Sequence, residues 1–174
     1  MSDKLIRELI RDVPNFPSEG ILFKDITPVL RDPQAFSHAV TAFAELSNSY
    51  DLVAGVEARG FIFGAAIAQY AGKGFIPIRK SGKLPAASFS ESYALEYGEN
   101  VLQIHQDAIQ KGERVFLIDD VLATGGTLGA ASKLVERCGG VIDTAAVLME
   151  IAGLGGRANF SALYPQLEIA VLLT

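Results

Sequence analysis

The stretch VFLIDDVLATGGT, residues 115–127, decides the fold class. Apolar residues lead into two adjacent carboxylates, Asp119 and Asp120, and a turn of small residues precedes a helical pattern over residues 127–137. A buried strand that passes through a glycine-rich turn into a helix is typical of an open α/β sheet, where ligands bind at the carboxyl ends of the strands. The stretch therefore predicts an α/β fold with a ligand site at that edge.

The residue types in this stretch suit a sugar phosphate. Asp119 and Asp120 can accept hydrogen bonds from vicinal hydroxyls. The turn can bring backbone N–H groups and hydroxyls close to an anion at a helix N-terminus; its residues are Ala123, Thr124, Gly125, Gly126 and Thr127. A glycine turn capped by its carboxylates is the alternative, but packing explains adjacent aspartates poorly. A Walker A lysine and a GxGxxG motif are both missing from the sequence.

The rest of the chain alternates apolar strands with helical patterns, which predicts a mostly parallel twisted sheet flanked by helices. The predicted helices cover residues 3–11, 33–50, 60–71 and 127–137. The predicted strands cover residues 52–56, 75–79, 114–119, 141–150 and 167–173. Two more strands, 88–97 and 100–106, follow one another without a helix and predict a hairpin-like excursion from the sheet. The proline-rich residues 13–28 predict irregular structure.

Composition limits the class of protein. The 174 residues carry 15 Lys and Arg against 20 Asp and Glu, a formal net charge of −5, and 49% are hydrophobic. They indicate one folded domain, residues 1–174, and argue against nucleic-acid binding. The longest apolar run is shorter than the roughly 18 residues of a membrane-spanning helix, and the N-terminus does not resemble a signal peptide. One cysteine excludes an internal disulfide, so a cytoplasmic location is expected.

Residues 115–127 resemble the phosphoribosyl-diphosphate (PRPP) signature of the type I phosphoribosyltransferases. Four other stretches are similar to the adenine branch of that family, and the resemblance covers residues 6–173: FPSEGILFKDITPVLRDP (16–33), GVEARGFIFG (55–64), PIRKSGKLP (77–85) and SYALEYG (92–98). The resemblance implies purine salvage: transfer of the 5-phosphoribosyl group from PRPP to adenine, giving AMP and pyrophosphate through an oxocarbenium-like transition state. It also implies a homodimer, and Mg²⁺ held by the oxygens of PRPP with no direct protein ligand.

Basic residues after two other predicted strands are candidate ligands of the diphosphate. Arg59 lies between a strand and a helix, and the resemblance places it in a pyrophosphate loop over residues 57–60 with a catalytic role beside Asp119 and Asp120. A second basic cluster could neutralise the leaving group, with a solvated loop as the alternative; its residues are Arg79, Lys80 and Lys83. The resemblance further suggests that one of these residues serves the site of the neighbouring subunit.

The resemblance also implies a base-recognition hood within an N-terminal arm, residues 1–32. Backbone groups near Leu22 and Lys24 and the ring of Phe23 would hold the base. Ile151 would pack on its other face. For Phe23 and Ile151, an ordinary core position is the alternative.

A mobile catalytic loop is implied over residues 84–99, and its closure would exclude water. In that loop Glu96 would be the acid or base at purine N7, and Tyr97 would lie over bound PRPP or AMP. An exposed hairpin carboxylate is the alternative for Glu96. Other functions remain open from the residues alone: transfer to another base such as xanthine or orotate, or a PRPP-sensing regulator that binds nucleic acid.

Overall fold

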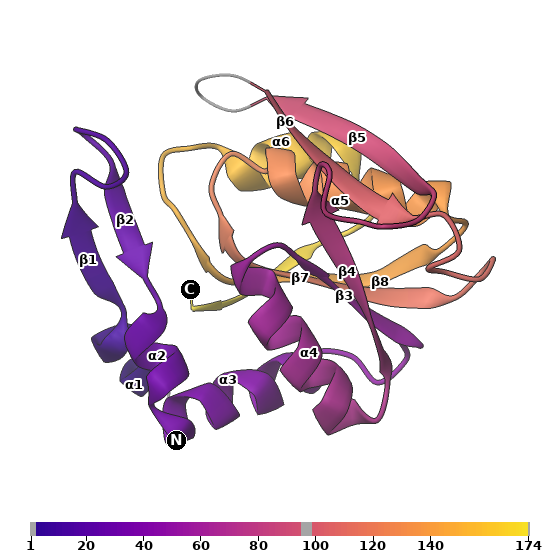
Figure 1. Ribbon diagram of the computed structural model, residues 1–174. Coiled ribbons are helices and arrows are strands. Elements are labelled where there is room, and N and C mark those ends of the chain that lie inside the picture. The colour runs from indigo at the N-terminus through magenta and orange to yellow at the C-terminus, as the bar shows by residue number, and fades with distance from the viewer. Residues whose placement is uncertain (1–2, 95–98, 174) are drawn as a thin grey trace.

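A computed structural model describes residues 3–94 and 99–173 and places helices on both faces of a central sheet (Figure 1). The seven-stranded sheet has the order β5-β6-β4-β3-β7-β8-β9, and β1 and β2 form a separate two-stranded sheet. The strands are β1 Arg11–Pro14, β2 Leu22–Asp25, β3 Leu52–Val56, β4 Gly74–Lys80, β5 Ser88–Ala94, β6 Glu99–His105, β7 Arg114–Leu122, β8 Val141–Glu150 and β9 Ile169–Leu173. The helices are α1 Asp3–Leu9, α2 Thr27–Arg31, α3 Pro33–Ala44, α4 Arg59–Ala71, α5 Gly126–Arg137 and α6 Gly156–Leu163.

The predicted α/β architecture is confirmed. Strands β4, β3, β7, β8 and β9 are joined by parallel pairing, whereas β6 pairs antiparallel with β4 and β5 antiparallel with β6. The hairpin β5–β6 thus extends one edge of the sheet rather than leaving it. Because parallel strands end at the same edge, the segments that follow β3, β4, β7 and β8 meet there.

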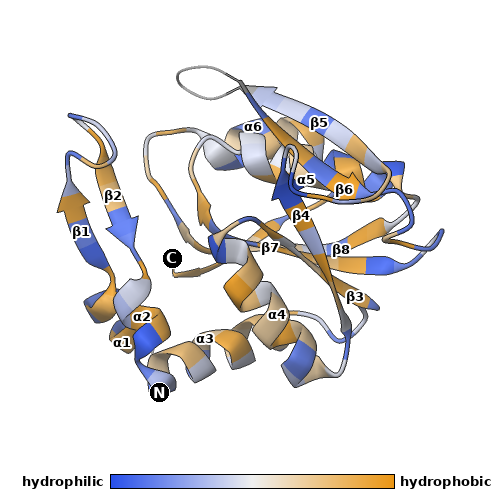
Figure 2. Cartoon of the chain, in the orientation of Figure 1, coloured by the Kyte–Doolittle hydropathy of each residue, from blue (hydrophilic) through white to orange (hydrophobic). Residues whose placement is uncertain are grey.

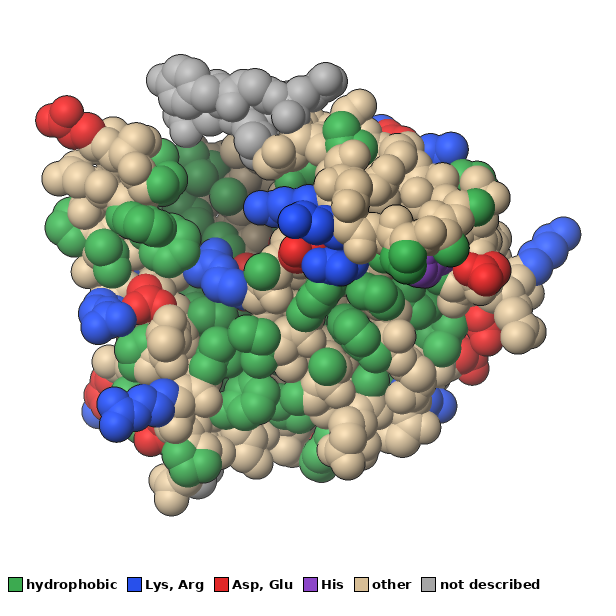
Figure 3. All heavy atoms as spheres, viewed as in Figure 1, with side chains coloured by type: hydrophobic (Ala, Val, Ile, Leu, Met, Phe, Trp, Pro, Cys, Tyr) green, Lys and Arg blue, Asp and Glu red, His purple; other side chains and the backbone are tan. Residues whose placement is uncertain are grey.

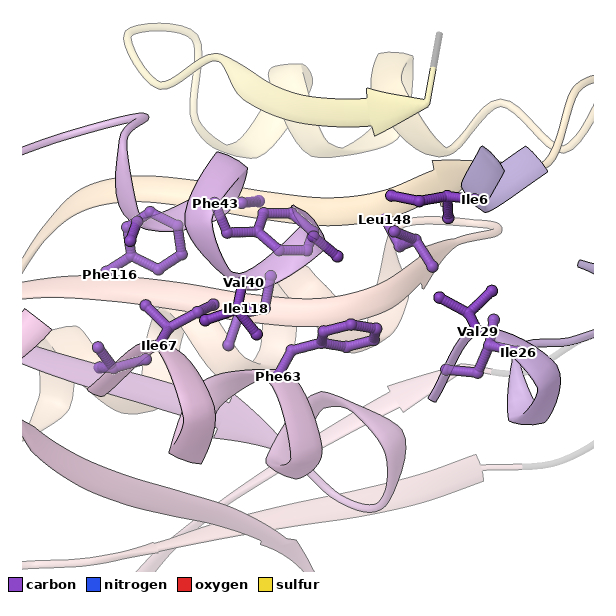
Figure 4. Packing of buried hydrophobic residues seen from close by; sticks show 14 of the residues in the cluster. Ile6, Ile26, Val29, Val40, Phe43, Phe63, Ile67, Phe116, Ile118 and Leu148 are labelled. Carbon is purple, nitrogen blue, oxygen red and sulfur yellow. The ribbon is translucent and has the colours of Figure 1, made fainter. Parts of the chain in front are cut away.

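Two apolar clusters occupy the two faces of the sheet. Helices α3 and α4 cover one face, where Phe43, Phe63 and Phe116 are fully buried (Figure 4). Helix α5 covers the other face, with Leu134 and Phe160 in its cluster. Figure 2 shows α3 and α4 mainly in hydrophobic colours and the edge strand β5 mainly in hydrophilic ones. In the described part of the chain, no helix is both long and apolar enough to cross a membrane.

The prediction of irregular structure over residues 13–28 is confirmed for residues 15–21 and wrong for the segments on either side. Strands β1 and β2 pair antiparallel, and helix α2 follows directly. The prolines occupy positions that need no backbone donor: Pro14 ends β1, and Pro28 lies in the first turn of α2. Asp25 accepts hydrogen bonds from the backbone N–H and the hydroxyl of Thr27, which joins the second strand to that helix.

Other boundaries differ from the predicted ones for local reasons. Strand β7 continues beyond Asp119 to Leu122 because its ladder with β8 does. Helix α3 begins as predicted at Pro33, after its cap Asp32, whose side chain accepts two backbone N–H groups, but it ends at Ala44 rather than at residue 50. Helix α6 was not predicted, because a helix with one large buried side chain, Phe160, has little apolar periodicity.

Candidate active site

Gly60 allows the first turn of α4, which follows β3, to lie directly against the end of β7. A Cβ on Gly60, in the first turn of α4, would lie 2.9 Å from the carbonyl oxygen of Ile118, so the helix touches the strand directly. This contact brings the preceding residue, Arg59, next to the aspartates. Arg59 Nε lies 2.8 Å from Asp120 Oδ2 in an ion pair, without hydrogen-bond geometry. Asp120 Oδ2 is therefore buried without a hydrogen-bond donor among the described residues.

The two adjacent carboxylates lie at the end of β7, with Asp119 half-buried. Asp120 is almost fully buried, and its backbone N–H donates to Asp119 Oδ1 at 2.8 Å. Burial, followed by the neighbouring Asp120 carboxylate, raises the pKa of Asp119 well above its ordinary value. Burial also raises the pKa of Asp120, although the Arg59 guanidinium opposes that shift. Two carboxylates kept in such surroundings indicate a ligand that supplies hydrogen-bond donors.

The turn after β7 leads into the N-terminus of α5 as predicted. Gly125 adopts a left-handed conformation (φ 83°), and the first helical bond runs from the N–H of Gly129 to the carbonyl of Gly125. No residue in the described ranges accepts the backbone N–H groups of residues 124–127. A cavity of about 210 Å³ lies here; its lining includes Leu122, Ala123, Thr124, Gly125, Thr127 and Leu154. Such N–H groups beside a small cavity at a helix N-terminus are suited to bind an anion, and we call residues 123–127 the anion cradle.

Leu154 in this cavity was not predicted. It lies in the segment between β8 and α6, and its side chain is 43% exposed, which is high for a leucine. The predicted base contact Ile151 lies in the same segment, half-buried, and its backbone N–H donates to Leu122 O at 2.9 Å. An isolated apolar residue in a glycine-rich loop carries no sequence signal for such a position.

The basic cluster divides into paired and unpaired side chains. Arg79 donates from Nε and Nη2 to the two carboxylate oxygens of Glu57, at 3.1 and 3.3 Å, and from Nη1 to Lys83 O. The hydrogen bonds from Arg79 lower the pKa of Glu57. Lys80 and Lys83 are exposed, and neither side chain has an ion-pair partner in the described part of the chain. Glu57 also begins a cis peptide bond to Ala58 in the predicted pyrophosphate loop.

The β1–β2 hairpin stands apart from the sheet and is joined to the site by Arg59. Arg59 Nη1 donates to Lys24 O at 3.0 Å, and its guanidinium lies 4.7 Å from the centre of the Phe23 ring. The Lys24 side chain instead pairs with Asp12 on β1 at 2.6 Å. Leu22 is 51% exposed, and Phe23 packs edge-on against the exposed ring of Phe16. Arg59 therefore contacts Asp120 and also two of the predicted base-binding residues, Phe23 and Lys24.

Basic side chains gather in Figure 3 between the β1–β2 hairpin and the β5–β6 hairpin, beside a hollow in the surface. The β5–β6 hairpin is attached to α5 through Glu91, which pairs with Lys133 at 3.0 Å and with Arg137 at 3.8 Å. The predicted residues Glu96 and Tyr97 lie outside the described residues.

Comparison with known proteins agrees with this geometry. The family model described as "Phosphoribosyl transferase domain" matches residues 29–158, which include the aspartates and the cradle. An adenine phosphoribosyltransferase from Thermoanaerobacter sp. (strain X514) is 51% identical over 154 residues, 87% of this chain and 89% of that protein. The chain belongs to the adenine phosphoribosyltransferase family.

Solved structures of adenine phosphoribosyltransferases share the whole architecture. The enzyme from Thermoanaerobacter pseudethanolicus has a TM-score of 0.92 at 47% identity, over 98% of both chains. The enzyme from Saccharomyces cerevisiae, solved with D-2,5-dideoxy-2,5-imino-altritol 1,6-bisphosphate and adenine, has a TM-score of 0.90 at 37% identity, over 98% of both chains. The resemblance in the sequence motifs is thus confirmed by both sequence and structure.

Proposed function

We propose that the protein transfers the 5-phosphoribosyl group of PRPP to adenine, giving AMP and pyrophosphate in purine salvage. One observation carries the proposal: two adjacent carboxylates, Asp120 buried and Asp119 half-buried, lie at the end of β7 beside the anion cradle. A phosphate ester with a vicinal diol matches this pair of features, because the cradle offers donors and the carboxylates offer acceptors. Membership of the adenine phosphoribosyltransferase family supports adenine as the base.

In this proposal the cradle holds the 5-phosphate of PRPP. Backbone N–H groups over residues 123–127 donate to the phosphate, together with the hydroxyls of Thr124 and Thr127. Asp119 and Asp120 accept hydrogen bonds from the ribose hydroxyls. Asp120 Oδ2 supports this role, because it is buried without a donor among the described residues.

The diphosphate of PRPP would lie over the end of β3 and the basic cluster. Arg59 is proposed to hold it with the backbone of residues 57–60, and Lys80 and Lys83 to balance its charge. Arg79 would contribute mainly by holding Glu57, to which it donates through two nitrogens. Arg59 would have to leave Lys24 O to reach the diphosphate.

The base would bind against the hairpin that Arg59 now contacts. Backbone groups near Leu22 and Lys24 would pair with adenine, and the base would lie between Phe23 and Ile151. The salt bridge from the Lys24 side chain to Asp12 supports recognition through the backbone, because the side chain is turned to β1.

The reaction would break the C1–oxygen bond to pyrophosphate and form the bond from ribose C1 to adenine N9. Positive charge develops on the ribose in the transition state, so the work of the protein is positioning and charge stabilisation. With adenine bound as the tautomer that carries its proton on N7, Glu96 is proposed to take that proton as the lone pair of N9 attacks C1. Closure of residues 84–99 over the site, with Tyr97 over the ligand, would exclude water.

Mg²⁺ is proposed to enter with PRPP and pyrophosphate. In this proposal the oxygens of the diphosphate and water supply most of its ligands. Mg²⁺ neutralises part of the leaving-group charge when it is bound. We also propose a homodimer and a cytoplasmic location, with no nucleic-acid or membrane partner. Sedimentation of the purified protein tests the dimer.

The test of the proposed function is AMP formation from adenine, PRPP and Mg²⁺. Hypoxanthine, guanine, xanthine and orotate are matched alternative substrates under the same conditions. We expect turnover with adenine to exceed turnover with every other base by at least about a hundredfold, because a site built on paired hydrogen bonds rejects bases that leave them unmet. Faster turnover with another base would assign the protein to that base instead.

A further inference from the structure

Helix α6 packs against the anion cradle through main-chain atoms, with no side chain between them. A Cβ on Gly156 would lie 2.3 Å from the carbonyl oxygen of Ala123, and a Cβ on Gly125 would lie 2.6 Å from the carbonyl oxygen of Gly156. Neither position has room for a side chain, so the turn after β7 and the first residue of α6 lie in direct contact. The cradle is therefore supported by α6 as well as by its own helix α5.

One side chain of α6 adds a directed contact to this support. Asn159 Nδ2 donates to the carbonyl oxygen of Thr124 at 2.9 Å. The peptide bond from Thr124 to Gly125 is trans, so its C=O and N–H point in opposite directions across one plane. Holding the carbonyl toward Asn159 consequently aims the N–H of Gly125 away from α6.

The fixed peptide belongs to the cavity proposed to take the phosphate. Thr124 and Gly125 both line the 210 Å³ cavity, and the Gly125 N–H has no acceptor among the described residues. A peptide before a left-handed glycine can rotate at modest cost, because glycine tolerates many backbone conformations. A hydrogen bond to the carbonyl removes that freedom before the anion arrives.

Helix α6 is itself well anchored, so the position of the Asn159 amide donor is fixed. Arg157 donates to Glu150 Oε2 from two nitrogens and to Ile169 O from Nη1, which ties the helix to the ends of β8 and β9. Phe160 is fully buried. Asn159 is exposed, and its backbone N–H continues the helix by donating to Gly155 O. Truncation of this side chain would leave the core and the helix intact.

We propose that Asn159 is a positioning residue for PRPP: it orients the Thr124–Gly125 peptide so that the Gly125 N–H donates to the 5-phosphate. This inference rests on the proposed function and adds a residue that no motif contains. It acts through the backbone, so its removal affects ligands that carry the 5-phosphate and spares adenine.

The experiment compares five variants with the wild type, one of them the conservative change Asn159→Gln. Asn159→Ala removes the donor, and Asn159→Asp replaces it with an acceptor that repels the Thr124 carbonyl. Ser161→Ala is the matched truncation at an exposed position of the same helix, and Ala158→Asp is the matched addition of negative charge. The measurements are KM for PRPP, KM for adenine, kcat, the Kd of AMP by calorimetry and the melting temperature.

We expect Asn159→Ala to raise KM for PRPP and the Kd of AMP about fivefold, the equivalent of one lost hydrogen bond. Asn159→Asp should raise both further than Ala158→Asp does, while KM for adenine and the melting temperature stay at their wild-type values. Asn159→Gln, which keeps an amide donor, should recover part of the loss. Unchanged KM for PRPP in Asn159→Ala, or an equal rise in Ser161→Ala, would overturn the proposal.

The proposed function is tested separately by the wild type. If the wild type forms no AMP from adenine and PRPP, the proposed function fails whatever the variants do. If it forms AMP and the Asn159 variants bind PRPP and AMP normally, only the role of Asn159 fails.

Discussion

The cradle and the β1–β2 hairpin are built in opposite ways. The cradle consists of backbone groups held between α5 and α6 by contacts that leave no room for a Cβ. The hairpin stands apart from the sheet, and its strands are linked by exposed ion pairs, Arg11 with Asp25 and Lys24 with Asp12 (Figure 1). Arg59 joins it to the aspartates.

This difference matches what each region is proposed to recognise. A phosphate has nearly the same shape and charge in every phosphoribosyl compound, so a preorganised cradle loses little by being rigid. A base must enter, stack and leave as a different compound. A hairpin joined to the site through the side chain of Arg59 can move at the cost of the contacts of that side chain with Lys24 and Phe23. We therefore expect substitutions beside the cradle to change activity or stability strongly, and substitutions in the hairpin to change them less.

The largest effect is expected from removing both carboxylates before the cradle. Asp119→Asn together with Asp120→Asn should lower kcat/KM for PRPP about a hundredfold to a thousandfold, because the two carboxylates proposed to accept the ribose hydroxyls are lost. Steady-state kinetics with varied PRPP measure this change. Full activity in the double variant would remove the ribose assignment.

Removing the link between the two regions should have the next largest effect. Arg59→Ala loses the ion pair to Asp120, the hydrogen bond to Lys24 O and the contact with Phe23. We expect turnover to fall about tenfold to a hundredfold and limited proteolysis of the N-terminal arm to become faster. Arg11→Ala is the control, because it loosens the hairpin without touching the aspartates. Equal proteolysis of wild type and Arg59→Ala would show that Arg59 does not hold the hairpin.

A matched pair of glycines compares the rigidity of the two regions. Gly125 in the cradle and Gly20 in the hairpin turn both have positive φ, but only Gly125 faces backbone at 2.6 Å; nothing lies within 4 Å of a Cβ on Gly20. Gly125→Ala should lower the free energy of unfolding by about 2–4 kcal/mol and raise KM for PRPP, whereas Gly20→Ala should cost about 1 kcal/mol. Denaturant unfolding measures both. Equal losses would contradict the contrast between the regions.

The smallest expected effect is a gain in stability from a single aspartate. The pKa of Asp119 is raised in the folded state, so the folded protein binds its proton more tightly than the unfolded chain. Asp119 therefore destabilises the folded protein more and more as the pH rises, from the ordinary pKa of an aspartate to the raised pKa that Asp119 has in the folded state. Asp119→Asn keeps the oxygen that accepts from the Asp120 N–H and should raise the melting temperature at neutral pH by about 2–4 °C.

The control for that prediction is to measure the melting temperatures of both proteins over a range of pH. The gain from Asp119→Asn should shrink as the pH falls below the ordinary pKa of an aspartate, where both chains carry a neutral group. A gain that stays constant across this range would point to packing rather than charge.

Much of the sheet could be predicted from the sequence. Strands β3 and β8 have the predicted bounds, because β3 is a short apolar run between Asp51 and Glu57 and β8 begins after two glycines and ends at Glu150. The β1–β2 hairpin could not be predicted. Its prolines lie at the ends of a strand and of a helix, and those ends are defined only by the pairing of β1 with β2. Helix α6 has too few buried side chains to show a period.

The candidate site divides in the same way. Asp119, Asp120 and the glycine turn are contiguous, so their chemistry is visible in one stretch of sequence. The pairing of Arg79 with Glu57 and the contact of Asn159 with Thr124 join residues 22 and 35 positions apart. No local pattern specifies such pairs, because they depend on how the loops meet at the edge of the sheet.

The contact of Gly125 with Gly156 has a consequence for how sequences of this fold can vary. In each case the missing side chain would meet main-chain atoms of the opposite loop, Gly156 O in one direction and Ala123 O in the other. A smaller neighbour cannot compensate, since every amino acid carries the same main chain. A saturation library selected for growth on adenine should therefore retain glycine at both positions, and no second substitution at the facing residue should rescue either loss.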